Sequence, residues 1–151
     1  MNSKRKQVHN RMCLKLPAVS VNEGVARAAV AAFCAQANPD IGELADIRCA
    51  VSEAVTNCIV HAYKGGMGMI YITVLLLRGE LRVIVKDKGC GIADVARARE
   101  PLFTTGASDE RSGMGFTVME NFMDRLTVRS RPGKGTVVAM SKRIGRSVEG
   151  E

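Results

Sequence analysis

The stretch that decides the fold reads MIYITVLLLRGELRVIVKDKGCG and covers residues 69–91. Its two apolar runs, 69–77 and 81–86, are joined by Arg78-Gly79-Glu80, and this pattern predicts a β-hairpin. Because both runs are almost continuously apolar, the hairpin is expected to be largely buried. The second strand is expected to end at Asp87-Lys88-Gly89-Cys90-Gly91, a segment that carries turn residues.

One short strand and two helices are expected before the hairpin. Residues 12–16 alternate in polarity and predict the strand. Residues 23–37 predict a helix with Asn22 as its N-cap. Asp40 is expected to open the second helix, which continues to about Tyr63 with an apolar stripe at the 3.6-residue period.

The first of these helices is apolar on two sides. One face includes Val25 and Ala32, and the other includes Val30 next to Arg27. Either alanine simply tolerates exposure to water there, or the helix is buried twice, once by the core and once by a partner. The surface around Arg27 is therefore the candidate protein-contact surface.

After the hairpin we expect a short helix, an unpatterned polar segment, a longer helix and two strands. These elements cover residues 93–99, 101–112, 113–123, 126–130 and 136–140. The order β-α-α-β-β-α-α-β-β predicts an α+β fold, in which helices lie on one face of a mostly antiparallel sheet in a two-layer α/β sandwich.

Length and composition are those of one compact domain of 151 residues, 46% of them apolar and 25% charged. We expect a basic N-terminal arm at residues 1–11, a single domain at 12–143 and a flexible tail at 144–151. The net charge of +7 gathers toward the two ends, as in solvated tails, and aromatic residues make up only 4% of the chain. Both features argue against direct binding of nucleic acid.

No membrane-spanning or secretory segment is predicted. The longest apolar run, at 69–77, is about half as long as the 20 or so residues that a membrane helix needs. No apolar signal-peptide core follows the basic N-terminus, so we expect a cytoplasmic protein. The five cysteines include no C-x-x-C pair, and we interpret them as reduced packing residues rather than zinc ligands or a disulfide framework.

Four separated segments carry groups suited to a nucleotide, although the chain has neither a P-loop nor a Rossmann glycine motif. Glu53 and Asn57 lie one helical turn apart, and an amide oxygen is a hard ligand suited to Mg²⁺, although such pairs are also common on plain helix surfaces. Asp87 ends a buried strand, where an ionised carboxylate needs a donor such as an exocyclic amine. Gly89 and Gly91 would let a planar ring approach the backbone, unless they only form a turn.

The other two segments begin later elements of the chain. Gly113 and Gly115 at a helix start would expose backbone N–H groups and the positive end of the helix dipole, which favour phosphate, unless they only form the turn into the helix. Thr136 would add a hydroxyl near a base, or merely begin a strand. Taken together in this order, the four segments predict one nucleotide site.

These segments resemble the N, G1, G2 and GT boxes of the GHKL family, which includes gyrase, Hsp90, histidine kinases and MutL. Within that family, residues 52–57 (SEAVTN), 101–105 (PLFTT) and 110–124 (ERSGMGFTVMENFMD) are similar to the sporulation anti-sigma F factors, which are serine-protein kinases. The resemblance covers about residues 12–140 and implies the Bergerat type of ATP-binding fold.

The resemblance also implies a role for each matching residue. Asn57 would hold Mg²⁺ on the phosphates of ATP, and Asp87 would bind the adenine amino group. Glu53 would be the general base that takes the proton from a serine hydroxyl. Residues 101–112 would form a lid over ATP, in which Arg111 would stabilise phosphate charge or hold the partner, unless it is a solvated cation. The other residues implied to bind the nucleotide are Gly89, Gly91, Thr104, Thr105, Ser112, Gly113, Met114, Gly115 and Thr136.

The function that this resemblance implies is an anti-sigma factor with kinase activity. Such a protein binds and inhibits a sporulation sigma factor as a homodimer, and uses ATP to phosphorylate a serine of its anti-anti-sigma antagonist. The alternatives are an anti-sigma serine kinase of the general stress pathway and a sigma-binding module that binds ATP without phosphoryl transfer. A histidine kinase is disfavoured because no phosphoacceptor helix pair precedes the domain.

Overall fold

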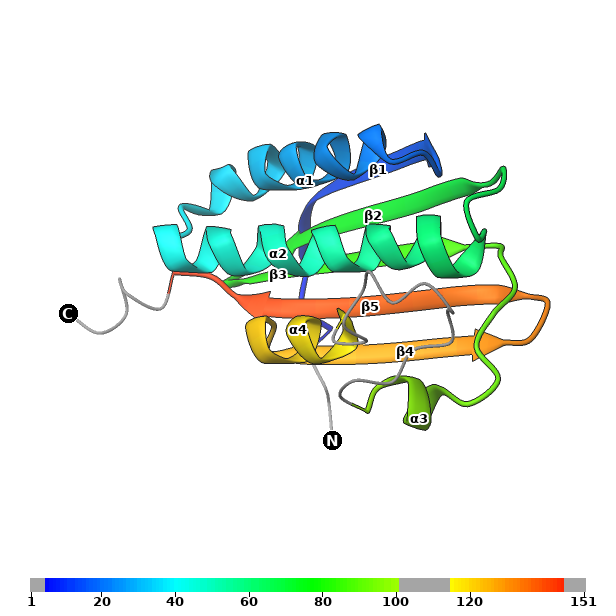
Figure 1. The fold of residues 1–151 in the computed structure, drawn as a ribbon. Helices are drawn as coiled ribbons and strands as arrows, with labels where there is room; N and C mark the ends of the chain where they lie inside the picture. The colour runs from blue at the N-terminus through cyan, green and yellow to red at the C-terminus, as the bar shows by residue number, and fades with distance from the viewer. Residues whose placement is uncertain (1–4, 101–114, 146–151) are drawn as a thin grey trace.

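The computed structural model describes residues 5–100 and 115–145 as one layer of helices packed on one sheet. The five strands are β1 (Val8–Pro17), β2 (Met69–Leu77), β3 (Glu80–Asp87), β4 (Arg125–Arg131) and β5 (Gly135–Arg143). They lie in the order β1-β2-β3-β5-β4, and every neighbouring pair is antiparallel. The expected α+β fold, with helices on one face of an antiparallel sheet, is confirmed (Figure 1).

The predicted hairpin forms the middle of the sheet, with Leu77 opposite Glu80 on either side of its turn. The first strand is longer than expected, because it begins at Val8 rather than at residue 12 and pairs with β2 from there. The expected N-terminal arm at 1–11 therefore contributes its last residues to the sheet. Before the strand, Lys6 Nζ lies 2.8 Å from Glu80 Oε2.

The helices are α1 (Val21–Cys34), α2 (Ile41–Asn57), α3 (Val95–Ala98) and α4 (Gly115–Phe122). A 3₁₀ turn (Ala35–Ala37) follows α1, and a π-helical turn (Cys58–Ala62) follows α2. Asn22 is not the N-cap of α1: that position is Ser20, and the Asn22 side chain donates instead to the carbonyl of Pro17. Asp40 opens α2 as expected, in a capping box that it shares with Glu43.

The hydrophobic core lies between the sheet and the helices. Helix α2 runs along the middle of the sheet with Ile47, Val51 and Val55 fully buried (Figure 1). Helix α1 buries Ala26, Val30 and Cys34 in the same core. Its second apolar side stays exposed, since Val21 and Val25 are 74% and 47% accessible.

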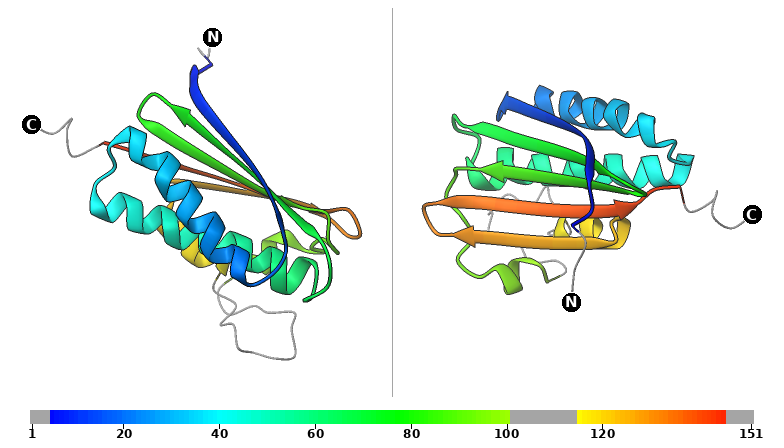
Figure 2. Two further views of the ribbon diagram at one scale, coloured as in Figure 1. Left: turned by 90° about the horizontal axis from the view of Figure 1, so that it is seen from above. Right: turned by 180° about the vertical axis from the view of Figure 1, so that it is seen from behind.

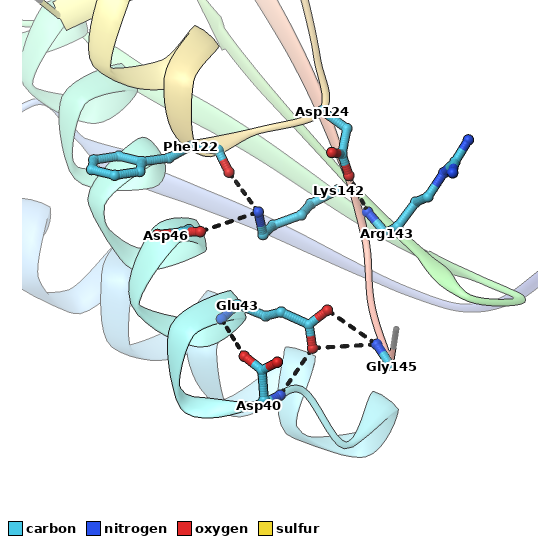
Figure 3. Close-up of polar contacts among 8 residues, drawn as sticks. All are labelled: Asp40, Glu43, Asp46, Phe122, Asp124, Lys142, Arg143 and Gly145. Carbon is cyan, nitrogen blue, oxygen red and sulfur yellow. Dashed lines mark hydrogen bonds and ion pairs between the residues drawn. The ribbon is translucent and has the colours of Figure 1, made fainter. Parts of the chain in front are cut away.

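A polar network fixes the C-terminal end of β5 to the helices (Figure 3). Lys142 Nζ donates to the Phe122 carbonyl at 2.7 Å and lies 3.2 Å from Asp46 Oδ2. These contacts join the end of α4 to the first half of α2. Because α4 is thereby held against α2, the network helps to set the position of the N-terminus of α4, where the candidate site lies.

Candidate functional site

The deepest polar group of the candidate site is the carboxylate of Asp87 at the end of β3. Its side chain points to the helical side of the sheet and is only 5% exposed. Asp87 Oδ1 accepts hydrogen bonds from the N–H groups of Gly89 at 2.9 Å and Thr136 at 3.2 Å. Burial raises the pKa of Asp87, and the hydrogen bonds that favour the ionised form only partly offset this.

The second oxygen of Asp87 faces Cys58, the first residue of the π-helical turn. The Cys58 thiol lies 3.6 Å from Asp87 Oδ2, and burial, together with this negative neighbour, raises the pKa of the thiol. Cys58 is therefore a neutral donor at neutral pH. Among the described residues, this weak donor is the only side chain that reaches Oδ2, so this oxygen keeps capacity to accept a further, stronger hydrogen bond.

The glycines after Asp87 are required by close packing of the protein's own backbone. A Cβ at Gly89 would overlap the carbonyl of Ala62, and one at Gly91, where φ is +74°, would overlap the carbonyl of Arg131. The packed backbone also makes a hydrogen bond from Cys90 N to Ala62 O at 2.9 Å. The approach of a planar ring to Gly89 and Gly91 remains a prediction. In the structure, close backbone packing already explains why both positions are glycine.

Thr136 is 7% exposed and lies in a hydroxyl network at the start of β5. Its Oγ1 lies 2.8 Å from Ser130 Oγ, which also accepts from the N–H of Ile92 at 2.7 Å and donates to the carbonyl of Gly135. Ser130, near the end of β4, thus connects the start of β5 to the segment that follows Asp87. Sequence reasoning missed Ser130 and Cys58, because neither belongs to a spacing motif and both act through neighbours distant in sequence.

The polar pair on α2 lies against the start of α4. A Cβ added at Gly115 would lie 3.3 Å from Glu53 Oε2 and from both terminal atoms of the Asn57 amide. Glu53 and Asn57 are both half-buried. Asn57 immediately precedes Cys58, which contacts Asp87, so this pair and Asp87 lie near the same end of α2. Their membership of one nucleotide site stays a prediction.

The described residues contain no cluster of three His, Cys, Asp or Glu side chains that could hold a metal ion alone. A divalent cation at this site would need oxygens from a ligand or water besides those of Asn57 and Glu53. Several expected site residues lie outside the described part of the chain, and their roles stay predictions. These residues are Thr104, Thr105, Arg111, Ser112, Gly113 and Met114.

Arg27 lies on α1, within reach of the helix that carries Glu53. Its Nη1 is 3.5 Å from Glu23 Oε1, and Glu23 in turn accepts a hydrogen bond from the hydroxyl of Ser52. The candidate contact residue is therefore connected through one carboxylate to the neighbour of Glu53 in the sequence. Its role in partner contact stays a prediction.

No helix in the described residues is long and apolar enough to cross a membrane.

Residues 16–142 match the family model described as a histidine kinase-like ATPase domain. The chain is 55% identical to an anti-sigma F factor of Caldanaerobacter subterraneus subsp. tengcongensis, over 93% of this chain and 99% of that protein. It is 50% identical to an anti-sigma F factor of Geobacillus sp., over 93% of this chain and 97% of that protein.

Solved structures share the fold at low sequence identity. The RsbU and RsbW domains of Rv1364c from Mycobacterium tuberculosis match with a TM-score of 0.66 and 21% identity, over 91% of this chain and 33% of that one. Full-length ShkA in complex with AMPPNP matches with a TM-score of 0.54 and 20% identity, over 84% of this chain and 31% of that one.

Proposed function

Because the chain belongs to the anti-sigma F factors, a family with histidine kinase-like ATPase domains, we propose that it is an ATP-dependent serine kinase that also sequesters a sporulation sigma factor. The proposed substrate is a serine of an anti-anti-sigma protein, and the proposed active form is a homodimer. The observation that carries the kinase proposal is the meeting of Glu53, Asn57 and Gly115 at the end of α2, one residue before the Cys58 contact with Asp87.

Asp87 fits the adenine end of ATP. Its carboxylate is buried at a fixed place by two backbone N–H groups, and its second oxygen can accept from an exocyclic amine. Burial of the amine and the carboxylate together makes each hydrogen bond to the ionised acceptor stronger than one in water. Thr136 lies next to this carboxylate and would border the same pocket.

Asn57 and the start of α4 fit the phosphate end. The amide oxygen of Asn57 is a suitable ligand for Mg²⁺, which commonly takes few protein oxygens and shares the oxygens of substrate phosphates. The donor set therefore fits this ion, which would neutralise charge on the phosphates when bound. Backbone N–H groups at the start of a helix favour negative charge, so the start of α4 near Asn57 would favour the same phosphates.

Glu53 would orient the serine hydroxyl of the partner toward the γ-phosphorus. As the serine oxygen bonds to phosphorus, the bond from phosphorus to the β–γ bridging oxygen breaks and ADP leaves. Glu53 receives the hydroxyl proton late in this step, because phosphoryl transfer depends chiefly on positioning and charge stabilisation. Its carboxylate lies one turn from Asn57, so base and cation ligand face the same volume.

The deciding experiment incubates the protein with γ-labelled ATP and a candidate anti-anti-sigma protein. We expect label on a partner serine, and we expect Glu53→Gln to reduce its rate of formation by about 10²–10⁴-fold while nucleotide still binds. Glu120→Gln is the matched control, since that carboxylate is exposed on α4 and pairs only loosely with Arg99. Transfer at the normal rate by Glu53→Gln would remove Glu53 from the mechanism.

The same incubation separates the alternatives. A partner that binds in the presence of ATP but gains no label would make the protein a sequestering module without kinase activity. Label transferred only to an antagonist from the general stress pathway would reassign the partner. Arg27→Glu tests the predicted contact residue: sigma binding and dimerisation that are both unchanged would give the two-sided apolar character of this helix another explanation.

A further inference from the structure

The face of the sheet that points away from the helices has an ordered arrangement of side chains. No described helix crosses it, but the N-terminal part of β1 passes in front of the other strands near one end of the sheet (Figure 2, right). Strand pairing places the outward residues of all five strands in rows that run across the sheet. The row through the middle is uncharged and consists of Cys13, Thr73, Ile84, Ala139 and Thr127.

The rows on either side of this uncharged row carry cations at β1, β3 and β4. One row contains Lys15, Lys86 and Arg129, and the other contains Arg11, Arg82 and Arg125. All of these side chains are exposed, and none of the three rows contains an acidic residue. The acid next to them is Glu80, whose carboxylate is already paired with Lys6 and Arg82.

The middle of this face is hollowed. A half-open depression of about 290 Å³ lies over β3, β5 and β4 and is lined by Ile84, Thr127, Arg129, Val137 and Ala139. That volume is at the lower limit for pockets that hold drug-sized ligands, so it fits one or two apolar side chains better. We call the uncharged row and its two flanking cationic rows the basic furrow.

The dimensions of the basic furrow match an α-helix. Each cationic row lies two residues along the strands from the middle row, so the two rows are about 13 Å apart at 3.3–3.4 Å per residue. An α-helix with its side chains is about 10–12 Å wide. A helix laid across the strands would place an apolar stripe on Ile84 and Ala139, with its two flanks beside the cations.

We propose that the basic furrow binds an amphipathic α-helix of a protein partner, with an apolar stripe and acidic residues on both sides of it. Charge complementarity selects this occupant. A second copy of the chain would bring cations against cations, which is unfavourable. Single-stranded nucleic acid favours several stacking rings, whereas the three rows contain one, Tyr71, with Lys15 and Lys88 over it at 5.6 and 5.1 Å.

The test uses the full chain and a fluorescent synthetic peptide of about five helical turns, with leucine along one face and glutamate on both flanks. Fluorescence anisotropy at low salt should show binding, and the same peptide with lysine for glutamate should not bind. The double variant Lys86→Glu and Arg125→Glu should weaken binding by about tenfold or more, since it reverses one charge in each cationic row. Arg48→Glu with Arg78→Glu is the control, because it makes the same charge change at exposed sites elsewhere.

Amide chemical shifts locate the bound peptide independently of any variant. We expect the shift changes at Thr73, Ile84 and Thr127, and none at Asp87 or Gly115. The peptide should therefore leave ATP binding unchanged, so a failure of this proposal can be told apart from a failure of the kinase proposal. Equal binding of the lysine peptide, equal loss in the control variant, or shifts on the helices would each overturn the proposal. So would tighter binding of a single-stranded oligonucleotide with the same dependence on Lys86 and Arg125, or self-association abolished by that double variant.

Discussion

Replacement of Asp87 by asparagine separates the structural and binding roles of its carboxylate. The substitution keeps the size of the side chain and its Oδ1 acceptor, so the N–H groups of Gly89 and Thr136 keep a partner. It places an NH₂ donor at Oδ2, where the wild type offers an acceptor to the Cys58 thiol and, in our proposal, to adenine.

The two effects differ in expected size. Two hydrogen bonds to a charged acceptor become neutral ones, which costs about 1 kcal/mol each. Removal of a buried charge offsets this cost, because burial already disfavours the ionised carboxylate and raises its pKa. We therefore expect a change in the free energy of unfolding of about 1 kcal/mol or less. In the variant the adenine amino group would face the NH₂ donor of the asparagine. The free energy of ATP binding should then weaken by about 2–3 kcal/mol, which is about 30- to 150-fold in affinity.

Urea unfolding measures the first effect and calorimetric titration with ATP and Mg²⁺ measures the second. Asp46→Asn is the matched control, since it makes the same chemical change at a carboxylate that pairs with Lys142 near the other end of α2. A folded Asp87→Asn protein with wild-type ATP affinity would refute the placement of adenine at this carboxylate. A loss of several kcal/mol in the free energy of unfolding would refute the expectation that removing the buried charge offsets the two weakened hydrogen bonds.

Three further predictions concern stability and reactivity. Gly91→Ala should lower the free energy of unfolding, measured in urea, by about 3 kcal/mol or more, because the new Cβ would overlap a carbonyl. Gly133→Ala is the control, since Gly133 has the same φ of +74° but open space around it, and it should cost about 1 kcal/mol. Equal losses in the two variants would contradict this prediction. Burial alone would raise the pKa of Glu80, but hydrogen bonds from Arg82 and Lys6 lower it below its ordinary 4.5. Glu80 therefore stabilises the fold above that pH, and this contribution is lost as the pH falls through its folded pKa. The stability difference between wild type and Glu80→Gln should therefore shrink in urea titrations below about pH 4.5, and a constant difference would contradict it. Burial raises the pKa of Cys34 to about 11 and also raises that of Cys58, so a thiol reagent should modify native protein quickly at the exposed cysteines only, which are Cys13, Cys49 and Cys90; fast reaction at Cys58 would mean that the Asp87 pocket opens.

Local patterns in the sequence were enough to predict most of the elements. The hairpin at 69–87 follows from apolar runs separated by a turn, and the start of α2 follows from Asp40, because both signals involve residues only a few positions apart. The start of α1 was predicted wrongly, since Asn22 satisfies the carbonyl of Pro17 rather than a helix N–H group. That choice depends on the path of the preceding strand, which no local pattern contains.

The sequence by itself determined which segments carry the polar groups of the site and that Glu53 and Asn57 share one side of a helix. Only the tertiary structure decided that the π-helical turn brings Cys58 to Asp87, that the start of α4 meets Glu53, and that the outward cations of three strands flank one uncharged row. The physical reason is the range of the interactions. Helix and strand periodicity is written in neighbouring residues, whereas strand register and helix packing are set by contacts between segments distant along the chain, which form only when the whole core is assembled.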